Sequence, residues 1–279
     1  MLPNKFSFKR IVLAVAALSF ILWVSFAFNS PTRPERVDRQ IALGPVSVDH
    51  APSLLAIAFV ADIHLEDSPQ SRETLKVLLD HIAASGPDMV LLGGDYVSIT
   101  DDKIAYETSA QHFVDALSVL NSIPIYAVLG NHEQWSDPGT WKQKFSNAGV
   151  KLIENEVSRN KLHDLCIRGF GDYFTSNHRF TEFPDNCEHQ AKITLAHDPA
   201  SAFQVGVEGL VLAGHTHCGQ VRLPFIKAPW TPTDAPQAAH CGYYEDDIRK
   251  VLVTSGIGTS LLPIRLGTTS QWEFITLHR

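Results

Sequence analysis

Three features that other classes of protein need are scarce or missing in this chain of 279 residues. Its 23 lysines and arginines are scattered and its net charge is −7, so the basic face of a nucleic-acid-binding protein is missing. No internal repeat and no low-complexity segment interrupts the sequence. We therefore predict one globular α/β domain that binds no nucleic acid, and nothing in the sequence indicates a protein partner.

Cysteine is also scarce, with four residues and no CxxC pair of the kind that suggests a zinc site. Their even number and loop-like spacing favour two disulfides formed in an oxidising compartment, Cys166–Cys187 and Cys218–Cys241. The alternative is four ordinary buried thiols.

Charged residues are missing from residues 11–28, which follow Lys5, Lys9 and Arg10. As a helix, eighteen residues would span roughly 27 Å, just enough to cross the hydrocarbon core of a bilayer. We expect residues 1–29 to be a retained signal anchor with one transmembrane helix. A cleaved signal peptide and a buried core helix are the alternatives. Residues 30–52 contain four prolines and are interpreted as a stalk, and residues 53–279 as the functional domain.

Short apolar runs recur through that domain, and runs of this length are typical of strands buried on both faces. The runs are Leu54–Ala61, Met89–Leu92, Ile123–Leu129, Lys192–Ala196, Gly209–Ala213, Val251–Thr254 and Trp272–Leu277. Residues 71–85 show helical spacing of leucines before a Ser-Gly-Pro stop, and a second helix is expected over 109–118. The pattern predicts an α/β fold.

A polar motif comes immediately after each of the first five apolar runs. The motifs are Asp62-Ile63-His64, Gly94-Asp95, Gly130-Asn131-His132-Glu133, His197-Asp198 and Gly214-His215-Thr216-His217. Ligand sites of open α/β sheets lie at the carboxyl ends of the strands, so we expect these five strand ends to meet in one crevice. In an extended segment, Asp-x-His and His-x-His would place both of their side chains on one side. The glycines would allow tight turns and close backbone approach.

The residue types in these motifs predict a metal site. Carboxylate, amide and imidazole groups together suit manganese, iron or zinc, whereas calcium and magnesium favour oxygen ligands alone. Each motif is weak by itself, because Asp and His are common on surfaces. Five of them in order, each at the end of a predicted strand, are hard to explain by chance. The predicted ligands are Asp62, His64, Asp95, Asn131, His197, His215 and His217.

This pattern resembles the calcineurin-like metallophosphoesterase family over roughly residues 54–279. The resemblance implies a four-layer α/β/β/α sandwich with two central mixed β-sheets. It implies two divalent ions, with manganese favoured over iron or zinc, and Asp95 bridging them. One ion would take Asp62, His64, Asp95 and His217, and the other Asp95, Asn131, His197 and His215. Segments 214–224 and 256–260 look most like a membrane-linked bacterial branch, which includes proteins similar to UDP-2,3-diacylglucosamine hydrolases and broader phosphodiesterases.

Two positions depart from the family pattern. Many members carry an acid three residues after the bridging Asp, where it orients the catalytic histidine. This chain has Ser98 there, so Asp101 or Asp102 would have to substitute, or the role is unfilled. The residue after the last ligand is commonly Gly, and here it is Cys218. Cys218 could be a soft extra ligand, a disulfide partner or a bystander, and we favour the disulfide.

The resemblance implies hydrolysis of a phosphodiester or pyrophosphate bond by attack of a metal-bound hydroxide. His132 would protonate the leaving oxygen or stabilise it electrostatically. Arg222 and Arg265 are candidates for contacting the substrate phosphate, with structural or solvated arginines as the alternative. The proline-rich residues 224–236 would form a rim loop, whose apolar side chains meet an acyl chain or the membrane surface, or simply pack.

We expect a single-pass protein of the bacterial inner membrane, held by residues 11–28, with its catalytic domain on the extracytoplasmic side. A lipid-linked or envelope phosphate compound is the favoured substrate. UDP-2,3-diacylglucosamine is the alternative, although it would be met on the cytoplasmic face, and a monoester is a further alternative. A non-catalytic metal-binding scaffold is the alternative from another class. The complete set of ligands and His132 argues against it.

Overall fold

The computed structural model describes residues 9–15, 18, 33–43, 54–222 and 230–278, which form two six-stranded mixed β-sheets. The first sheet has the order β1-β12-β2-β3-β4-β5, with β1 Glu35–Ala42, β12 Gln271–His278, β2 Leu54–Val60, β3 Met89–Leu92, β4 Ile125–Ala127 and β5 Lys151–Leu152. The second has the order β10-β11-β9-β8-β7-β6, with β10 Gly242–Glu245, β11 Arg249–Val253, β9 Gly209–Ala213, β8 Ala191–Leu195, β7 Leu165–Gly169 and β6 Glu156–Asn160.

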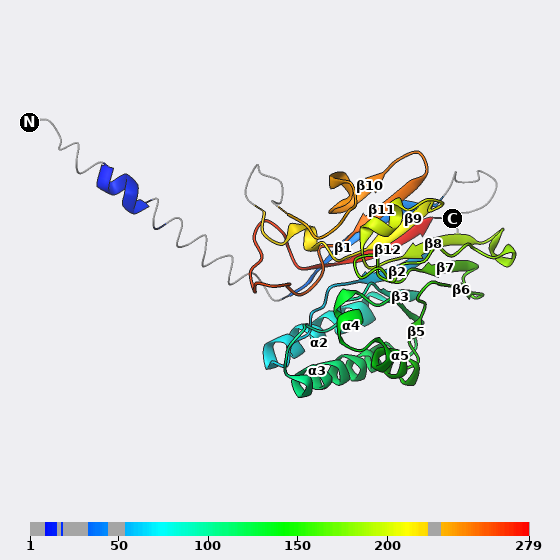
Figure 1. Cartoon of the computed structure of the whole chain (residues 1–279), viewed down its shortest axis with the longest axis horizontal. Helices are drawn as coiled ribbons and strands as arrows, with labels where there is room; N and C mark the ends of the chain where they lie inside the picture. The colour runs from blue at the N-terminus through cyan, green and yellow to red at the C-terminus, as the bar shows by residue number, and fades with distance from the viewer. Residues whose placement is uncertain (1–8, 16–17, 19–32, 44–53, 223–229, 279) are drawn as a thin grey trace, which may run out of the picture.

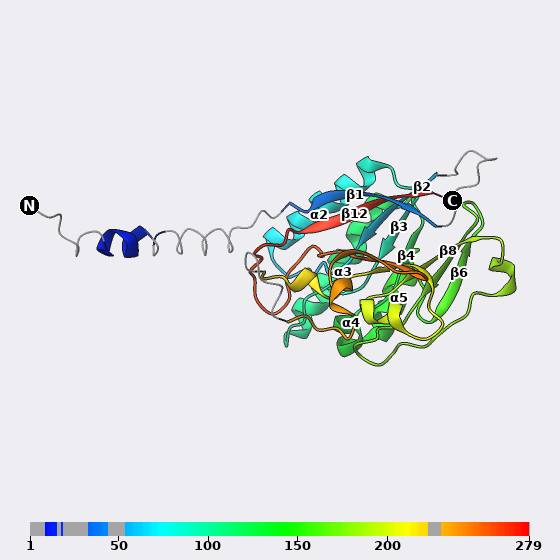
Figure 2. The ribbon, with the colours of Figure 1, turned by 90° about the horizontal axis from the view of Figure 1, so that it is seen from above.

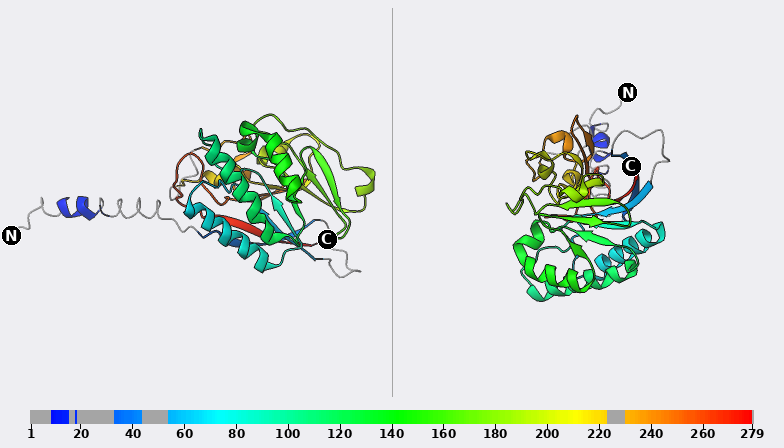
Figure 3. Two further views of the ribbon diagram at one scale, coloured as in Figure 1. Left: turned by 90° about the horizontal axis from the view of Figure 1, so that it is seen from below. Right: turned by 90° about the vertical axis from the view of Figure 1, so that its right-hand side faces the viewer.

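Four α-helices cover the outer face of the first sheet (Figure 1), and the end-on view in Figure 3 shows them as a separate layer. They are α2 Pro69–Ser85, α3 Lys103–Ala116, α4 Asn131–Ser136 and α5 Pro138–Asn147. Helix α2 begins after Ser68, whose side chain accepts the Ser71 N–H, and ends at Gly86 with a left-handed φ of 61°. The predicted helices at 71–85 and 109–118 therefore correspond to α2 and α3.

Apolar side chains fill the space between the layers. One buried cluster lies between the helices and the first sheet and includes Trp141 and Phe113. A second lies between the two sheets and joins Ile57 and Leu91 of the first sheet to Leu195 and Leu212 of the second. Because both faces of β2 and β3 are covered, their sequences are apolar throughout, as expected for strands of this kind.

The fourth layer differs from the expected layer of α-helices. In the described part of the chain, the outer face of the second sheet is covered by short 3-10 helices, among them η3 (Pro199–Phe203) and η5 (Gln237–Ala239). Small residues such as Ala202 pack there against Val211 and Val253.

The predicted stalk at residues 30–52 is wrong for part of its length. Residues 35–42 form β1, which pairs in parallel with β12 at the edge of the first sheet. Its mixed charges concealed an alternating pattern, in which Ile41 is buried and the Arg39 side chain pairs with buried Glu273 at 2.9 Å. Figure 2 shows β1 and β12 running side by side. The strand was missed because its polar residues find their partners far along the chain.

Most of the predicted membrane segment, residues 11–28, lies outside the described residues. Residues 9–15 are helical. Among the helices that the structure describes, none combines the length and the apolar character needed to cross a bilayer.

Candidate metal centre

The five polar motifs converge at one edge of the two sheets, as the sequence predicts. Asp62 and Asp95 follow β2 and β3 of the first sheet, whereas His197 and His215 follow β8 and β9 of the second. Loop-to-loop hydrogen bonds join these ends: the Asp62 N–H donates to the Gly94 carbonyl at 3.0 Å, and the Gly214 N–H donates to the His197 carbonyl at 2.9 Å. The two sheets therefore bring residues from both halves of the chain together.

One group of side chains gathers around His64. Its Nε2 lies 3.0 Å from His217 Nε2 and 3.6 Å from Asp95 Oδ2, and Asp62 Oδ1 lies 4.0 Å from His217 Nε2. All four side chains are buried. Asp62, His64 and His217 offer ligand atoms within 4.8 Å of one another, which is close enough to hold a metal ion. Two imidazole nitrogens only 3.0 Å apart cannot both carry protons.

A second group gathers around His197. Its Nε2 lies 3.1 Å from Asn131 Oδ1, 3.2 Å from His215 Nδ1 and 3.3 Å from Asp95 Oδ2. His197 Nδ1 donates to the Gly93 carbonyl at 2.7 Å, and His215 Nε2 donates to the Pro232 carbonyl at 2.6 Å. A carbonyl can only accept, so in the neutral imidazoles that bind a metal these bonds leave His197 Nε2 and His215 Nδ1 without protons and facing the centre. Asp95 belongs to both neighbourhoods.

The electrostatics of the centre favour uncharged imidazoles at His64, His215 and His217, whereas at His197 the carboxylates of Asp95 and Asp62 outweigh burial and raise its pKa well above the usual range. Burial lowers the pKa of His64 to about 3 and lowers that of His217 well below its usual range. Burial also raises the pKa of Asp62 to about 7. Neutral imidazole and ionised carboxylate are the forms that bind metal ions. The donor set therefore fits divalent cations, whose charge would offset the cost of burying the carboxylates.

The backbone at the ligand motifs is left-handed, which corrects the expectation of extended segments. Asp62, His64, Asp95, His215 and His217 have φ values of 53°, 46°, 54°, 66° and 48°. Non-glycine residues rarely adopt this conformation, and it recurs at functional sites because surrounding contacts can hold it there. The side chains of Asp62 and His64 thus converge because the backbone turns in the left-handed region, and not because alternate residues of a strand share one face.

The glycines beside the ligands allow the loops to touch, as predicted. Gly94 has a φ of 93°, and a Cβ atom there would lie 2.6 Å from the Gly130 backbone nitrogen and 2.8 Å from His197 Nδ1. A Cβ at Gly214 would lie 2.6 Å from Asp62 Oδ2. Any larger residue at these positions would push the loops apart.

His132 lies at the mouth of the cluster and is oriented by a backbone carbonyl instead of an acid. Its Nδ1 donates to the Val97 carbonyl at 3.2 Å, and its backbone N–H donates to Asp95 Oδ1 at 2.9 Å. Ser98 donates to the His64 carbonyl, and Asp102 caps α3 by accepting two backbone N–H groups. Neither predicted substitute, Asp101 nor Asp102, is needed, because Val97 already fixes the ring and leaves Nε2 facing the cluster.

Glu133 is a functional residue whose role the sequence did not reveal. Its carboxylate is fully buried and accepts backbone N–H groups from Asp95 at 2.8 Å, Tyr96 at 2.8 Å and Gly130 at 2.9 Å. It thereby clamps the loop of Asp95 to the loop of Asn131. The only signal in the sequence was its place in the Gly-Asn-His-Glu motif.

Glu133→Gln should weaken this clamp, because an amide NH2 group would face backbone donors. We expect the free energy of unfolding to fall by about 2–3 kcal/mol, the usual cost of leaving buried donors unsatisfied. Urea unfolding measures the change. Glu107→Gln, at an exposed carboxylate on α3 that pairs with Lys144, should change it by less than about 0.5 kcal/mol. Equal stability of the two variants would contradict the clamp.

Neither of the two predicted substrate arginines is among the described residues that line the cavity over the cluster. Arg265 is buried, and its guanidinium donates to the carbonyls of Ser255 at 2.7 Å, Gly256 at 3.2 Å and Gly258. Arg265 therefore holds the loop after β11 in place, and its contact with a substrate phosphate stays a prediction. Arg222 is half-buried and is not among the described residues that line the cavity over the cluster.

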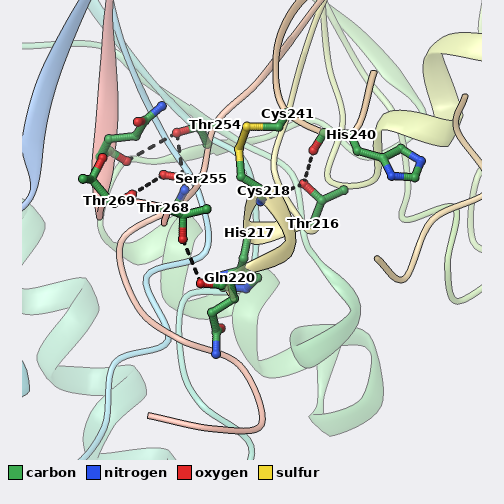
Figure 4. Close-up of a disulfide and its surroundings, with 12 residues drawn as sticks. Thr216, His217, Cys218, Gln220, His240, Cys241, Thr254, Ser255, Thr268 and Thr269 are labelled. Atoms are coloured by element: carbon green, nitrogen blue, oxygen red, sulfur yellow. Dashed lines mark hydrogen bonds between the residues drawn. A yellow bond between two sulfur atoms is a disulfide. The ribbon is translucent and has the colours of Figure 1, made fainter. Parts of the chain in front are cut away.

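Both predicted disulfides are present. Cys166–Cys187 joins β7 to η2 (Asp185–Cys187), at the end of the second sheet remote from the cluster. Cys218–Cys241 directly follows the predicted ligand His217, as Figure 4 shows. Thr216 reinforces this link by donating to the His240 carbonyl at 2.7 Å. The second disulfide thus ties the His215–His217 turn to the segment before β10, and Cys218 is no free ligand.

The two disulfides form a matched pair for an experiment, because they close loops of similar length, with sequence separations of 21 and 23. Removing either by Cys→Ala pairs should lower stability by about 3 kcal/mol. Only Cys218→Ala with Cys241→Ala should also weaken Mn²⁺ binding, by about 10–100-fold, the range for groups that support ligands. Calorimetric titration measures both affinities. Equal losses in the two double variants would count against a positioning role.

Comparisons with known proteins agree with this geometry. A profile described as calcineurin-like phosphoesterase matches residues 55–219. The chain is 30% identical to phosphodiesterase YaeI of Escherichia coli over 79% of this chain and 81% of that protein. It is 26% identical to protein YpbG of Bacillus subtilis, with 80% and 81% covered. It is also 26% identical to the transmembrane protein with metallophosphoesterase domain of Danio rerio, over 98% of this chain and 64% of the relative.

Solved structures with a similar fold include two nucleotidases. The 5'-nucleotidase precursor of Thermus thermophilus aligns with 16% identity and a TM-score of 0.45, over 81% of this chain and 54% of that one. The NAD nucleotidase of Haemophilus influenzae aligns with 13% identity and a TM-score of 0.44, over 75% and 46%. The chain therefore spans about half the length of each nucleotidase.

Proposed function

Because the chain belongs to the calcineurin-like phosphoesterase family and is a metal-dependent phosphoester hydrolase, we propose that it cleaves a phosphodiester or pyrophosphate bond with two divalent metal ions, manganese in first place. The observation that carries this proposal is the convergence of the seven predicted ligand side chains around Asp95. One ion would be held by Asp62, His64, Asp95 and His217. The other would be held by Asp95, Asn131, His197 and His215.

When bound, two such cations supply a water of lowered pKa and neutralise charge on the phosphate oxygens. The residues of this chain perform the remaining tasks. Water adds to phosphorus, the bond to the leaving oxygen breaks, and that oxygen must receive a proton. His132 can donate it from Nε2 once the ring carries a second proton, because the Val97 carbonyl holds the Nδ1 proton and aims Nε2 at the cluster.

The substrate is proposed to be a compound of the cell envelope. Both disulfides support an extracytoplasmic domain, because such bonds persist in oxidising compartments and are rare in the cytosol. UDP-2,3-diacylglucosamine is the weaker candidate, because it would be met on the cytoplasmic face of the membrane, where cysteine thiols stay reduced and disulfides are rare. The similarity to a phosphodiesterase of Escherichia coli supports the diester class. Attachment to the inner membrane through residues 11–28 remains part of the proposal.

The test is hydrolysis of bis(4-nitrophenyl) phosphate and of UDP-2,3-diacylglucosamine by the purified full chain. Both assays are run with Mn²⁺ and again after removal of metal with EDTA. We expect Mn²⁺-dependent release of 4-nitrophenolate that EDTA abolishes and added Mn²⁺ restores. Release of UMP at a comparable rate would move the substrate to the cytoplasmic alternative. Tight metal binding without any turnover would favour the non-catalytic scaffold.

A further inference from the structure

A cavity of about 700 Å³ opens over the metal cluster, and its rim is apolar. Its floor includes His64, Asp95, Asn131 and His215. Large apolar side chains line the rim although they remain exposed to solvent: Ile99, Trp135, Phe174, Trp230, Leu261 and Leu262. Soluble domains rarely gather exposed apolar groups in one place unless something binds there. The cavity is larger than a phosphate group needs, so the remainder of the ligand must occupy this part.

Aromatic rings continue from the cluster into the rim. The Trp135 ring lies 5.9 Å from the His132 ring and 5.9 Å from the Phe174 ring, and Phe174 in turn lies 4.9 Å from the His215 ring. Trp135 and Phe174 therefore form a wall that begins at the catalytic histidine. A chain leaving the phosphate would meet this wall first.

A second part of the rim is the loop 259–263, which the fold holds in an unfavourable conformation. Leu261 is 92% exposed and has a left-handed φ of 64°. Leucine rarely adopts this backbone conformation. Because the side chain is exposed, no burial of its apolar surface offsets the unfavourable backbone free energy. A left-handed backbone together with an exposed apolar side chain indicates that Leu261 is positioned for contact with a ligand.

Gln220 fixes this loop to the ligand turn. Its amide nitrogen donates to the carbonyls of Ser260 at 3.1 Å and Leu262 at 2.8 Å, and its amide oxygen accepts the Ser260 N–H at 2.8 Å. Gln220 lies three residues after His217, as Figure 4 shows. The exposed Leu261 is therefore positioned from the same turn that carries a metal ligand.

The charges of the cavity identify the kind of ligand. Among the described residues that line it there is no lysine or arginine, and Glu66 is acidic. A polyphosphate or a nucleotide would need cationic groups beyond the cluster. A phosphate at the predicted metal ligands would match the polar floor of the cavity, and a hydrocarbon chain would match its apolar rim.

We propose that this rim binds the hydrocarbon chain of an amphiphilic phosphate ester, with the phosphate at the metal cluster. The inference rests on the proposed function and narrows its substrate class. The group bound at the rim is the hydrocarbon chain of the substrate itself, not the surface of a bilayer. Burial of each methylene strengthens binding roughly fourfold, so covering only a few of them gives a large preference for long-chain esters.

The test compares 4-nitrophenyl methyl phosphate with 4-nitrophenyl decyl phosphate, each below its micelle-forming concentration, with the full chain and Mn²⁺. We expect kcat/KM to be at least tenfold higher for the decyl ester. Leu261→Asn combined with Trp230→Ser should lower the ratio of the two values, while the wall of Trp135 and Phe174 stays in place. Asparagine tolerates the left-handed backbone, so this change removes apolar surface and keeps the loop conformation.

Val205→Asn is the matched control, because Val205 is also exposed and does not line the cavity. It should leave the ratio unchanged. Equal kcat/KM for the two esters, or a ratio that the double variant does not lower, would overturn the inference even if the protein binds lipid vesicles. Failure to cleave either ester would overturn the proposed function itself, so the two failures are distinguishable.

Discussion

Asp95→Asn is expected to lower kcat/KM for bis(4-nitrophenyl) phosphate by about 10³-fold or more and to remove most of the bound metal. Asp95 Oδ2 lies 3.3 Å from His197 Nε2 and 3.6 Å from His64 Nε2, between the two groups of ligands. Asp62 Oδ1 also approaches both groups, but it lies 4.0 Å from His197 Nδ1 and 4.0 Å from His217 Nε2, farther away than Asp95 Oδ2. Loss of its negative charge removes several kcal/mol of cation binding, and 1.36 kcal/mol corresponds to a factor of ten.

Two measurements separate this role from a general loss of structure. Metal content is measured by elemental analysis, and the increase in melting temperature on adding Mn²⁺ is measured by calorimetry. Asp95→Asn should lose both signals, whereas Asp80→Asn, at an exposed carboxylate on α2 that pairs with Lys76, should keep both. If Asp95→Asn retained two ions per chain, the bridging assignment would be wrong.

The sequence predicts the site more completely than it predicts the fold around it. Strands β2, β3, β8 and β9 are apolar runs buried on both faces, and their polar ends are visible in the sequence without any knowledge of the partners. The convergence of Asp62, Asp95 and His215 then follows from a general rule for α/β sheets. The two disulfide pairs, which cysteine number and spacing favour over four buried thiols, are present in the structure.

The features that were missed depend on contacts without a signature in the residue types. The Val97 carbonyl orients His132, and any residue at position 97 has a carbonyl. The left-handed φ of Asp62 and His64 depends on backbone bonds to Gly94 and Asp95. Strand β1 depends on its pairing with β12, more than two hundred residues away. Such long-range partners become visible only in three dimensions.

Arg265 illustrates the same limit for charged side chains. In the sequence, an arginine near a predicted phosphate site is a reasonable substrate contact. In the structure its guanidinium donates to backbone carbonyls of the loop after β11 and lies 3.4 Å from His217 Nδ1. Arginine offers five donors, which makes it equally suited to satisfying carbonyls in a tightly turned loop. Residue type alone could not separate these roles.

His132→Ala should lower kcat for a dialkyl ester such as dimethyl phosphate by about 10²–10⁴-fold, the usual contribution of a general acid, while both metal sites keep their ions. The side chain lines the cavity, and its Nε2 lies 3.8 Å from Asp95 Oδ2. None of the predicted metal ligands is altered by this change. Metal content by elemental analysis should therefore equal that of the unaltered chain.

The identity of the leaving group distinguishes protonation from mere positioning. 4-Nitrophenolate is a stable anion that leaves without a proton, whereas an alkoxide requires one. His132→Ala should therefore impair dimethyl phosphate hydrolysis far more than bis(4-nitrophenyl) phosphate hydrolysis, and His81→Ala, at an exposed position of α2, should affect neither. Equal losses for both esters would show that His132 positions the phosphate instead. Because the Val97 carbonyl holds the proton on Nδ1, Nε2 must first acquire a second proton from solvent, so the protonated ring is the active acid.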